Sequence, residues 1–176
     1  MKNRFPAEPS EQDVSDFCMA ARDGDIVTVS GLLRRYGVKI VDKKDREFDD
    51  TALVWASYRG HLDIMDLLLE NGADVEKAGL FNSSPLVWAA MGNQPQAVEI
   101  LLEKGADLDK RNKEGKTALM IARERNFSDI VDMLEQCPID RQKKKDDLLE
   151  KSLREERLQR VRAAPSSKLV LKKNGK

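Results

Sequence analysis

The sequence repeats itself after 33 residues, and this recurrence limits what the chain can fold into. A gapless alignment of TALVWASYRGHLDIMDLLLENGAD, from Thr51, with SPLVWAAMGNQPQAVEILLEKGAD, from Ser84, superposes the two tryptophans of the chain. A further shift of 33 aligns TALMIARERN, from Thr117, and a backward shift of 36 aligns SDFCMAARDGD, from Ser15. Because a fixed period of this size is typical of stacked repeat architectures, we expect four successive units of similar structure.

Each unit has the pattern of two short helices followed by a polar connection. In the second unit, apolar and small residues over 52–59 predict a helix that ends at Gly60, and Asn93 and Asn126 occupy the matching positions of later units. Glycine and asparagine are the residues that best adopt the left-handed conformation after a helix. A second helix is predicted to end at Gly72. Since so small a pair cannot bury its apolar face alone, neighbouring units must stack to form a core.

The pattern resembles the ankyrin repeat over residues of about 10 to 140. The resemblance rests on T-A-L-V-W-A at 51–56, S-P-L-V-W-A-A at 84–90, T-A-L-M-I-A at 117–122, G-H at 60–61 and the two G-A-D turns. It implies an all-α repeat solenoid, an L-shaped stack of helix–turn–helix units with β-hairpin-like fingers between them. The histidine of the family's threonine-proline-leucine-histidine start is replaced by Val54, Val87 and Met120. In the family that histidine ties neighbouring loops together, so we expect modest stability.

The repeats are expected to occupy the first three quarters of the chain, followed by a charged tail. The expected division is a disordered N-terminus (1–9), four ankyrin-like repeats over 10–140 (about 10–44, 45–77, 78–110 and 111–140), a charged helical tail (141–164) and a basic disordered end (165–176). Ser10, followed by Asp13, is the expected N-cap of the first helix. Pro138 is expected to end the last helix of the repeats. Arg123 replaces the small residue of earlier units, which argues against a fifth repeat.

Formal net charge is zero, but the charges are unevenly distributed. Residues 138–176 hold 13 Lys and Arg against 6 Asp and Glu, a net charge of +7, which leaves −7 on residues 1–137. The tail is expected to fold back on the acidic body or to bridge to an acidic partner, and salt should weaken either contact. Leu149 and Leu153 share one face of the predicted tail helix, and we expect this helix to be solvated. The alternatives are that its leucines dock onto the last repeat or mediate self-association of the chain.

Residues suited to catalysis or metal binding do not form a recognisable set. His61, the single histidine, is expected to bond locally at a helix start, and Asp74 and Asp107 are expected to bond the backbone of their own turns. Cys18 and Cys137 lie far apart, and neither a phosphate-binding glycine loop nor a zinc pattern is present. We therefore expect no enzyme, no cofactor and no metal.

The sequence also indicates the cellular compartment of the protein. The N-terminal residues lack the apolar run of a secretory leader, and no stretch approaches the ~20 apolar residues of a membrane span. We expect a cytoplasmic protein, with the nucleus as an alternative.

In the architecture that the resemblance implies, finger tips and inner helices line a concave groove. The predicted partner-binding residues at these positions are Phe48, Trp55, Tyr58, Arg59, Leu80, Phe81, Trp88, Met91, Glu114 and Arg125. Asp50 and Ser83 are also placed on the groove side. Because thin fingers are poor places to bury a phenyl ring, Phe48 and Phe81 are expected to be exposed, as apolar partner sites are. The tryptophans are expected mainly to pack between repeats.

The expected function is a non-catalytic protein–protein interaction module, an adaptor or an occluding inhibitor, that is monomeric when unbound. The alternative is a nucleic-acid-associated or nuclear regulatory factor that uses the basic tail. Interleaved acidic residues and the lack of aromatic residues in the tail weaken that alternative.

Overall fold

The structure is a computed structural model that describes residues 8–163 of the chain. Contacts divide the chain into two units, Met1–Cys137 and Pro138–Lys176. Beyond Cys137 the structure describes the backbone of a helix and only some of its side chains. The predicted disordered ends at 1–9 and 165–176 fall almost wholly outside the described residues, and the limits of the single repeats remain predictions.

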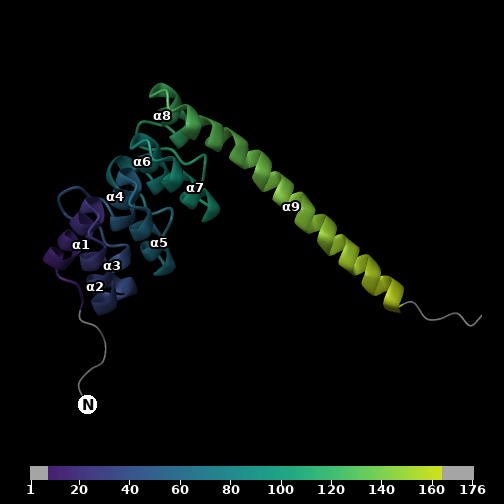
Figure 1. The fold of residues 1–176 in the computed structure, drawn as a ribbon, viewed down its shortest axis with the longest axis horizontal. Coiled ribbons are helices and arrows are strands. Elements are labelled where there is room, and N and C mark those ends of the chain that lie inside the picture. Colours follow the sequence, from purple (N-terminus) through teal and green to yellow (C-terminus); the bar gives the residue numbers. More distant parts are fainter. Residues whose placement is uncertain (1–7, 164–176) are drawn as a thin grey trace, which may run out of the picture. The chain divides into compact units, whose positions relative to one another are not determined.

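The first unit is a stack of helix pairs (Figure 1). The pairs are α1 (Glu11–Asp23) with α2 (Ile26–Tyr36), α4 (Ala52–Arg59) with α5 (Leu62–Glu70), α6 (Pro85–Met91) with α7 (Pro95–Glu103), and α8 (Ala118–Glu124) with the first turns of α9 (Ser128–Ala163). Helix α1 packs on α4, α4 on α6 and α6 on α8, while α2 packs on α5 and α5 on α7. This arrangement confirms the predicted all-α solenoid. The short α3 (Val38–Val41) lies in the insertion that lengthens the first repeat interval to 36.

Helix caps explain why each unit starts and stops where it does. The hydroxyl groups of Thr51, Ser84 and Thr117 accept hydrogen bonds from backbone N–H groups three residues later, at 3.3, 3.4 and 3.3 Å. At the other ends, Gly60, Asn93 and Asn126 have φ values of +74°, +54° and +60°, as predicted. The predicted cap of the first helix is also confirmed, because Ser10 and Asp13 form a reciprocal capping box.

A continuous core runs through the stack. Leu53 and Leu86 are buried at equivalent positions of α4 and α6, and Leu68 and Leu101 are buried at equivalent positions of α5 and α7. Complete burial of one leucine side chain contributes about 1.5–3 kcal/mol. The stacked units therefore share one core that no single pair could form, and Ile130 and Leu134 of α9 extend this core.

The fingers between the units are tight loops rather than β-hairpins. Among residues 8–163 the structure has no strand, only an isolated antiparallel bridge between Lys44 and Thr51. One backbone hydrogen bond closes each finger: Asp45 N–H to the Asp50 carbonyl (3.0 Å), Gly79 to Ser83 (2.9 Å) and Asn112 to Lys116 (3.0 Å). We name these loops the second, third and fourth fingers, after their repeats.

Acidic side chains link neighbouring loops. Carboxylate oxygens of Asp42, Asp50 and Glu76 accept hydrogen bonds from the backbone N–H groups of Asp74 (3.0 Å), Leu80 (2.8 Å) and Asp107 (2.8 Å). Each bond joins residues about one repeat apart. Neighbouring loops are therefore joined by hydrogen bonds although Val54, Val87 and Met120 replace the histidine.

Helix α9 continues through Pro138, so the prediction that this proline ends the helix is wrong. Proline removes one backbone hydrogen bond and typically costs about 3 kcal/mol inside a helix. The segment after it is rich in Lys, Arg, Glu and Leu, which favour helix and resume the regular pattern. Leu149 and Leu153 are 60% and 56% exposed.

Candidate partner-binding surface

In the second repeat, the predicted site residues Phe48 and Trp55 pack against each other. Their rings meet edge to face, with centroids 5.4 Å apart, and both side chains are half-buried. The carboxylate of Asp45, only 5% exposed, accepts hydrogen bonds from the Phe48 backbone N–H (2.6 Å) and from Trp55 Nε1 (3.4 Å). The expectation that Phe48 is exposed is therefore wrong. Asp45 bonds both the Phe48 backbone and the Trp55 indole, and so holds the Phe48 ring against Trp55 of α4.

In the third repeat the equivalent residues are arranged differently. Phe81 is 52% exposed, and Phe81 and Asn82 both adopt left-handed backbone conformations, with φ of +56° and +55°. Trp88 packs edge to face on Tyr58, with centroids 5.5 Å apart. Its Nε1 atom is buried and has no hydrogen-bond partner among the residues described. The prediction of exposure thus holds for Phe81, and the prediction of half-buried packing holds for both tryptophans.

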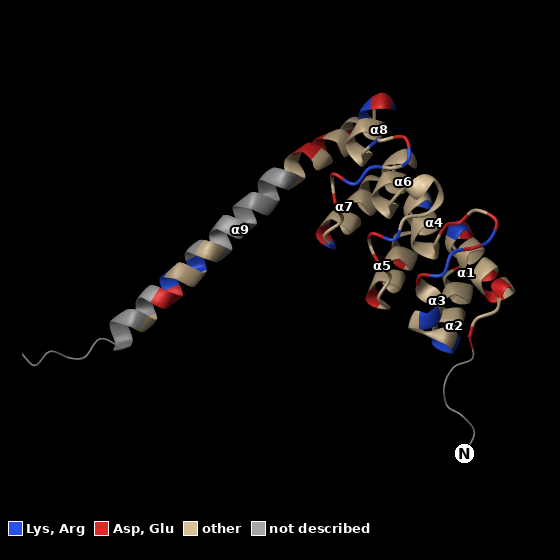
Figure 2. Cartoon of the chain, turned by 180° about the vertical axis from the view of Figure 1, so that it is seen from behind, with Lys and Arg blue, Asp and Glu red and all other residues tan. Residues whose placement is uncertain are grey.

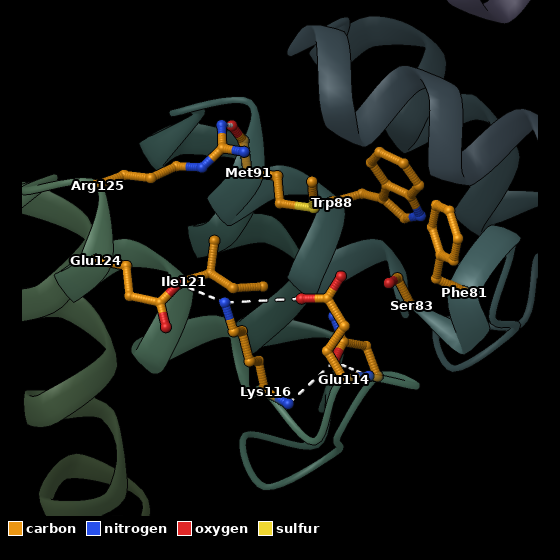
Figure 3. Close-up of a pocket in the computed structure, with 10 residues that line it drawn as sticks. Phe81, Ser83, Trp88, Met91, Glu114, Lys116, Ile121, Glu124 and Arg125 are labelled. Atoms are coloured by element: carbon orange, nitrogen blue, oxygen red, sulfur yellow. Dashed lines mark hydrogen bonds and ion pairs between the residues drawn. The ribbon is translucent and has the colours of Figure 1, made fainter.

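A pocket of about 200 Å³ lies between the third and fourth repeats (Figure 3). Five predicted site residues line it, Phe81, Trp88, Met91, Glu114 and Arg125, together with Ser83, Asn112, Lys116, Ile121 and Glu124. Figure 3 shows Trp88 and Phe81 side by side at one end of the pocket and Arg125 at the other. The pocket therefore combines aromatic surface, a thioether and charged groups, the mixture common at protein–protein binding sites.

The charges in this pocket are partly paired. The Lys116 ammonium lies 2.7 Å from a Glu124 oxygen and 3.6 Å from a Glu114 oxygen. The hydrogen bond to Glu124 is the main cause that raises the pKa of Lys116. Arg125 donates to the Met91 carbonyl (3.0 Å) and pairs with no carboxylate among the described residues. Lys116 is therefore neutralised, whereas Arg125 is exposed and its charge has no counterpart among the described residues.

The other predicted partner-binding residues do not line the pocket: Phe48, Trp55, Tyr58 and Arg59 belong to the second repeat and Leu80 to the third finger. Arg59 is exposed, with its guanidinium carbon 5.6 Å from the Tyr58 ring centroid, and Leu80 is half-buried. Asp50 and Ser83, placed on the groove side by the sequence, are each only 1% exposed. Asp50 is buried because its carboxylate caps the third finger at the Leu80 N–H. The Ser83 carbonyl closes that finger, and Ser83 lines the pocket wall.

Burial makes Asp50 an unusual carboxyl group. Desolvation raises its pKa to about 6, and the negative charges of Asp45 and Asp49 act in the same direction. The hydrogen bond from Leu80 and the charge of Lys44 oppose that rise. Neither Asp45 nor the burial of Asp50 was found from the sequence, since acidic residues in loops are ordinarily solvated.

Other chemically notable residues act structurally. His61 Nε2 lies 3.0 Å from the Arg22 carbonyl, so its bond reaches the preceding repeat and is not local as expected. Asp74 and Asp107 accept from the N–H groups two residues later (2.8 and 2.9 Å), which confirms the turn interpretation. Burial raises the pKa of the Cys18 thiol to about 12.

The described part of the chain contains no group of three or more His, Cys, Asp and Glu residues suited to a metal ion. It also contains no helix that is both long and apolar enough to cross a membrane.

Comparison with known proteins agrees with the stacked fold. The family model described as "Ankyrin repeats (3 copies)" matches residues 15–79 and 76–145. The ankyrin repeat and MYND domain-containing protein 1 of Mus musculus is 39% identical over 77 residues, which are 43% of this chain and 8% of that protein. The BTB/POZ domain-containing protein 3 of Schizosaccharomyces pombe is 38% identical over 66 residues, 38% of this chain and 12% of that protein.

The matched segments thus make up about a tenth of each of these relatives, while the family model extends over most of the chain described here. Ankyrin repeats generally serve as protein–protein interaction modules rather than as catalytic domains. The helix pairs, their caps and the match to the family model together show that this chain belongs to the ankyrin-repeat family.

Proposed function

We propose that this protein is a non-catalytic adaptor or occluding inhibitor, which binds a protein partner through the pocket between its third and fourth repeats. The observation that carries the proposal is the exposed Phe81 at the rim of a pocket that also contains Met91 and Arg125. An exposed aromatic ring and an exposed guanidinium in one pocket match the composition of binding hot spots, where single residues contribute ~2 kcal/mol or more.

The stack favours this function because it fixes the binding groups before the partner arrives. Lys113 of the fourth finger donates its backbone N–H to the Phe81 carbonyl at 2.8 Å, so the third and fourth fingers are tied together. Arg125 is likewise tied to the carbonyl of Met91. Groups already held in place lose little conformational entropy on docking. A second part of the proposed surface consists of the half-buried Phe48, Trp55, Tyr58 and Leu80 and the exposed Arg59.

A capture experiment with matched variants tests the proposal. The pocket variant is Phe81→Ser combined with Arg125→Ala, and the control is Val27→Ser combined with Val38→Ser. Val27 and Val38 are 74% and 73% exposed on the first repeat. Each protein is immobilised and exposed to a lysate of cells that express the natural chain, after circular dichroism has verified folding.

We expect at least one protein to be captured by the wild type and the control but not by the pocket variant. An identical set of captured proteins for all three would show that the pocket is not the binding site.

A further inference from the structure

The tryptophans at equivalent positions of the second and third repeats differ in whether their indole N–H has a hydrogen-bond acceptor. In the second repeat, Asp45 accepts the hydrogen bond of Trp55 Nε1 at 3.4 Å. In the third repeat, Ala78 stands 33 residues after Asp45, and Nε1 of Trp88 is buried without an acceptor in the described structure. An indole N–H can only donate. Leaving such a donor buried and unpaired is unfavourable, and the third repeat lacks the carboxylate that satisfies the equivalent donor in its neighbour.

The finger over this donor is also in a costly conformation. Phe48 is held against Trp55, but Phe81 is exposed and has a left-handed backbone. Asn82 is left-handed too, as is Asp49 at the equivalent position of the second finger, so Phe81 is the residue that differs. A left-handed conformation is unfavourable for a bulky residue such as Phe, whereas Asn and Asp adopt it more readily. Strain of this kind beside an unsatisfied polar group is typical of sites that a ligand completes. Figure 3 shows the Phe81 ring next to the indole nitrogen of Trp88.

The charge around the pocket indicates what the missing acceptor is. Both carboxylates of the pocket, Glu114 and Glu124, are engaged by Lys116. Arg125 has no carboxylate partner, and the exposed ammonium of Lys113 has no partner at all, within the described residues. Four of the seven residues over 110–116 are Lys or Arg, in the connection that leads into α8 (Figure 2). The connection over 110–116 therefore carries a net charge of +3, four Lys and Arg against Glu114, beside the pocket, although residues 1–137 carry a net charge of −7.

We propose that the pocket binds an acidic peptide segment of the partner protein, whose aspartate or glutamate carboxylate accepts the hydrogen bond of Trp88 Nε1. This carboxylate takes the role that Asp45 has in the second repeat. An apolar side chain next to it packs on Phe81, and Arg125 and Lys113 favour the negative charge. The donor is uncovered when the exposed Phe81 side chain turns aside, while the hydrogen bond from the Lys113 N–H to the Phe81 carbonyl holds the backbone of the third finger in place. The inference rests on the proposed function and specifies the chemistry of the partner.

The two tryptophans provide a matched pair of variants. Trp88→Phe keeps an aromatic ring against Tyr58 and removes the unpaired N–H, so the unfolding temperature should not fall. Trp55→Phe removes a paired N–H and leaves the buried Asp45 with one donor fewer, so its unfolding temperature should fall. Because the chain contains only two tryptophans, a ¹⁵N-correlated NMR spectrum of the full chain should show two indole N–H signals, which these variants assign.

The probe is a pool of synthetic heptapeptides with a central Asp or Glu followed by Leu or Phe, and the control pool has Asn or Gln at the centre. We expect the wild type to bind the acidic pool about tenfold more strongly, as for a charge-assisted hydrogen bond, and the Trp88 indole signal to move downfield. Trp88→Phe should lose this preference and Trp55→Phe should keep it.

Equal binding of the two pools would indicate a neutral carbonyl acceptor and overturn the inference. The same holds if neither pool binds, if Trp88→Phe keeps the preference, or if the Trp88 signal does not move. Loss of a captured protein by the Phe81 and Arg125 variant, without any preference for acidic peptides, would leave the proposed function intact and refute only this inference. Conversely, a preference that depends on Trp88, with no protein lost in capture, would refute the adaptor proposal alone.

Discussion

The buried Asp50 predicts an unusual dependence of stability on pH. Its side chain lies beneath the third finger, and one carboxylate oxygen accepts from the Leu80 N–H at 2.8 Å. The pKa of Asp50 is raised from 3.8 to about 6, chiefly by burial. Since the folded state takes up this proton more readily than the unfolded state, the contribution of Asp50 to stability is fully present below pH 3.8 and is lost as the pH rises through 6.

The substitution Asp50→Asn removes this titration and keeps an oxygen that can accept from Leu80. Linkage over the two pKa values gives about 2 kcal/mol between pH 4 and pH 7. The stability of Asp50→Asn relative to the wild type should therefore rise by about that amount from pH 4 to pH 7. Urea unfolding followed by circular dichroism at pH 4, 5, 6 and 7 measures the difference, with Asp66→Asn, an exposed carboxylate on α5, as the control.

A relative stability of Asp50→Asn that is constant to within about 0.5 kcal/mol across this range would refute the reasoning. It would mean that the carboxylate is solvated in the folded protein, despite its position beneath the finger. A decrease toward pH 7 would show that the folded state stabilises the charged form, for example through the Leu80 N–H and Lys44.

Three further predictions concern packing, thiol reactivity and the tail. Gly92→Ala should destabilise the protein by about 2 kcal/mol or more in urea unfolding, because a Cβ there would overlap the Tyr58 carbonyl oxygen. Gly31→Ala, which meets no atom within 4 Å in α2, should instead stabilise by about 0.5–1 kcal/mol, and a similar loss for both would contradict the packing argument. At pH 8 a maleimide should label Cys137, which is half-buried, before Cys18, whose pKa is raised to about 12; labelling of Cys18 in the native protein at a comparable rate would disprove its burial. Deletion of 141–176 should leave capture of the pocket partner nearly intact, whereas loss of a salt-sensitive binding to nucleic acid in a filter assay would favour the tail as the functional segment.

The sequence alone determined the family and the repeat architecture. A strict period of 33 fixes which positions must pack on the next unit, so Leu53 and Leu86 are buried as their equivalence requires. The caps were also predictable, because hydroxyl residues at helix starts and Gly or Asn at helix ends act locally through the backbone. Phe81, Trp88, Met91, Glu114 and Arg125 were placed on one surface from the repeat register, and the structure brings them into one pocket.

Only the tertiary structure decided how each copy departs from the repeat. Asp45 and Ala78 occupy equivalent positions of the repeat. Asp45 holds Phe48 and Trp55 together, whereas Ala78 offers no side-chain acceptor and Trp88 Nε1 has none among the described residues. The burial of Asp50 and the bond between His61 and Arg22 likewise depend on contacts between residues about 30 to 40 positions apart. A repeat period describes what the units share. The hydrogen bonds and charges that make one unit different are set by its neighbours in space.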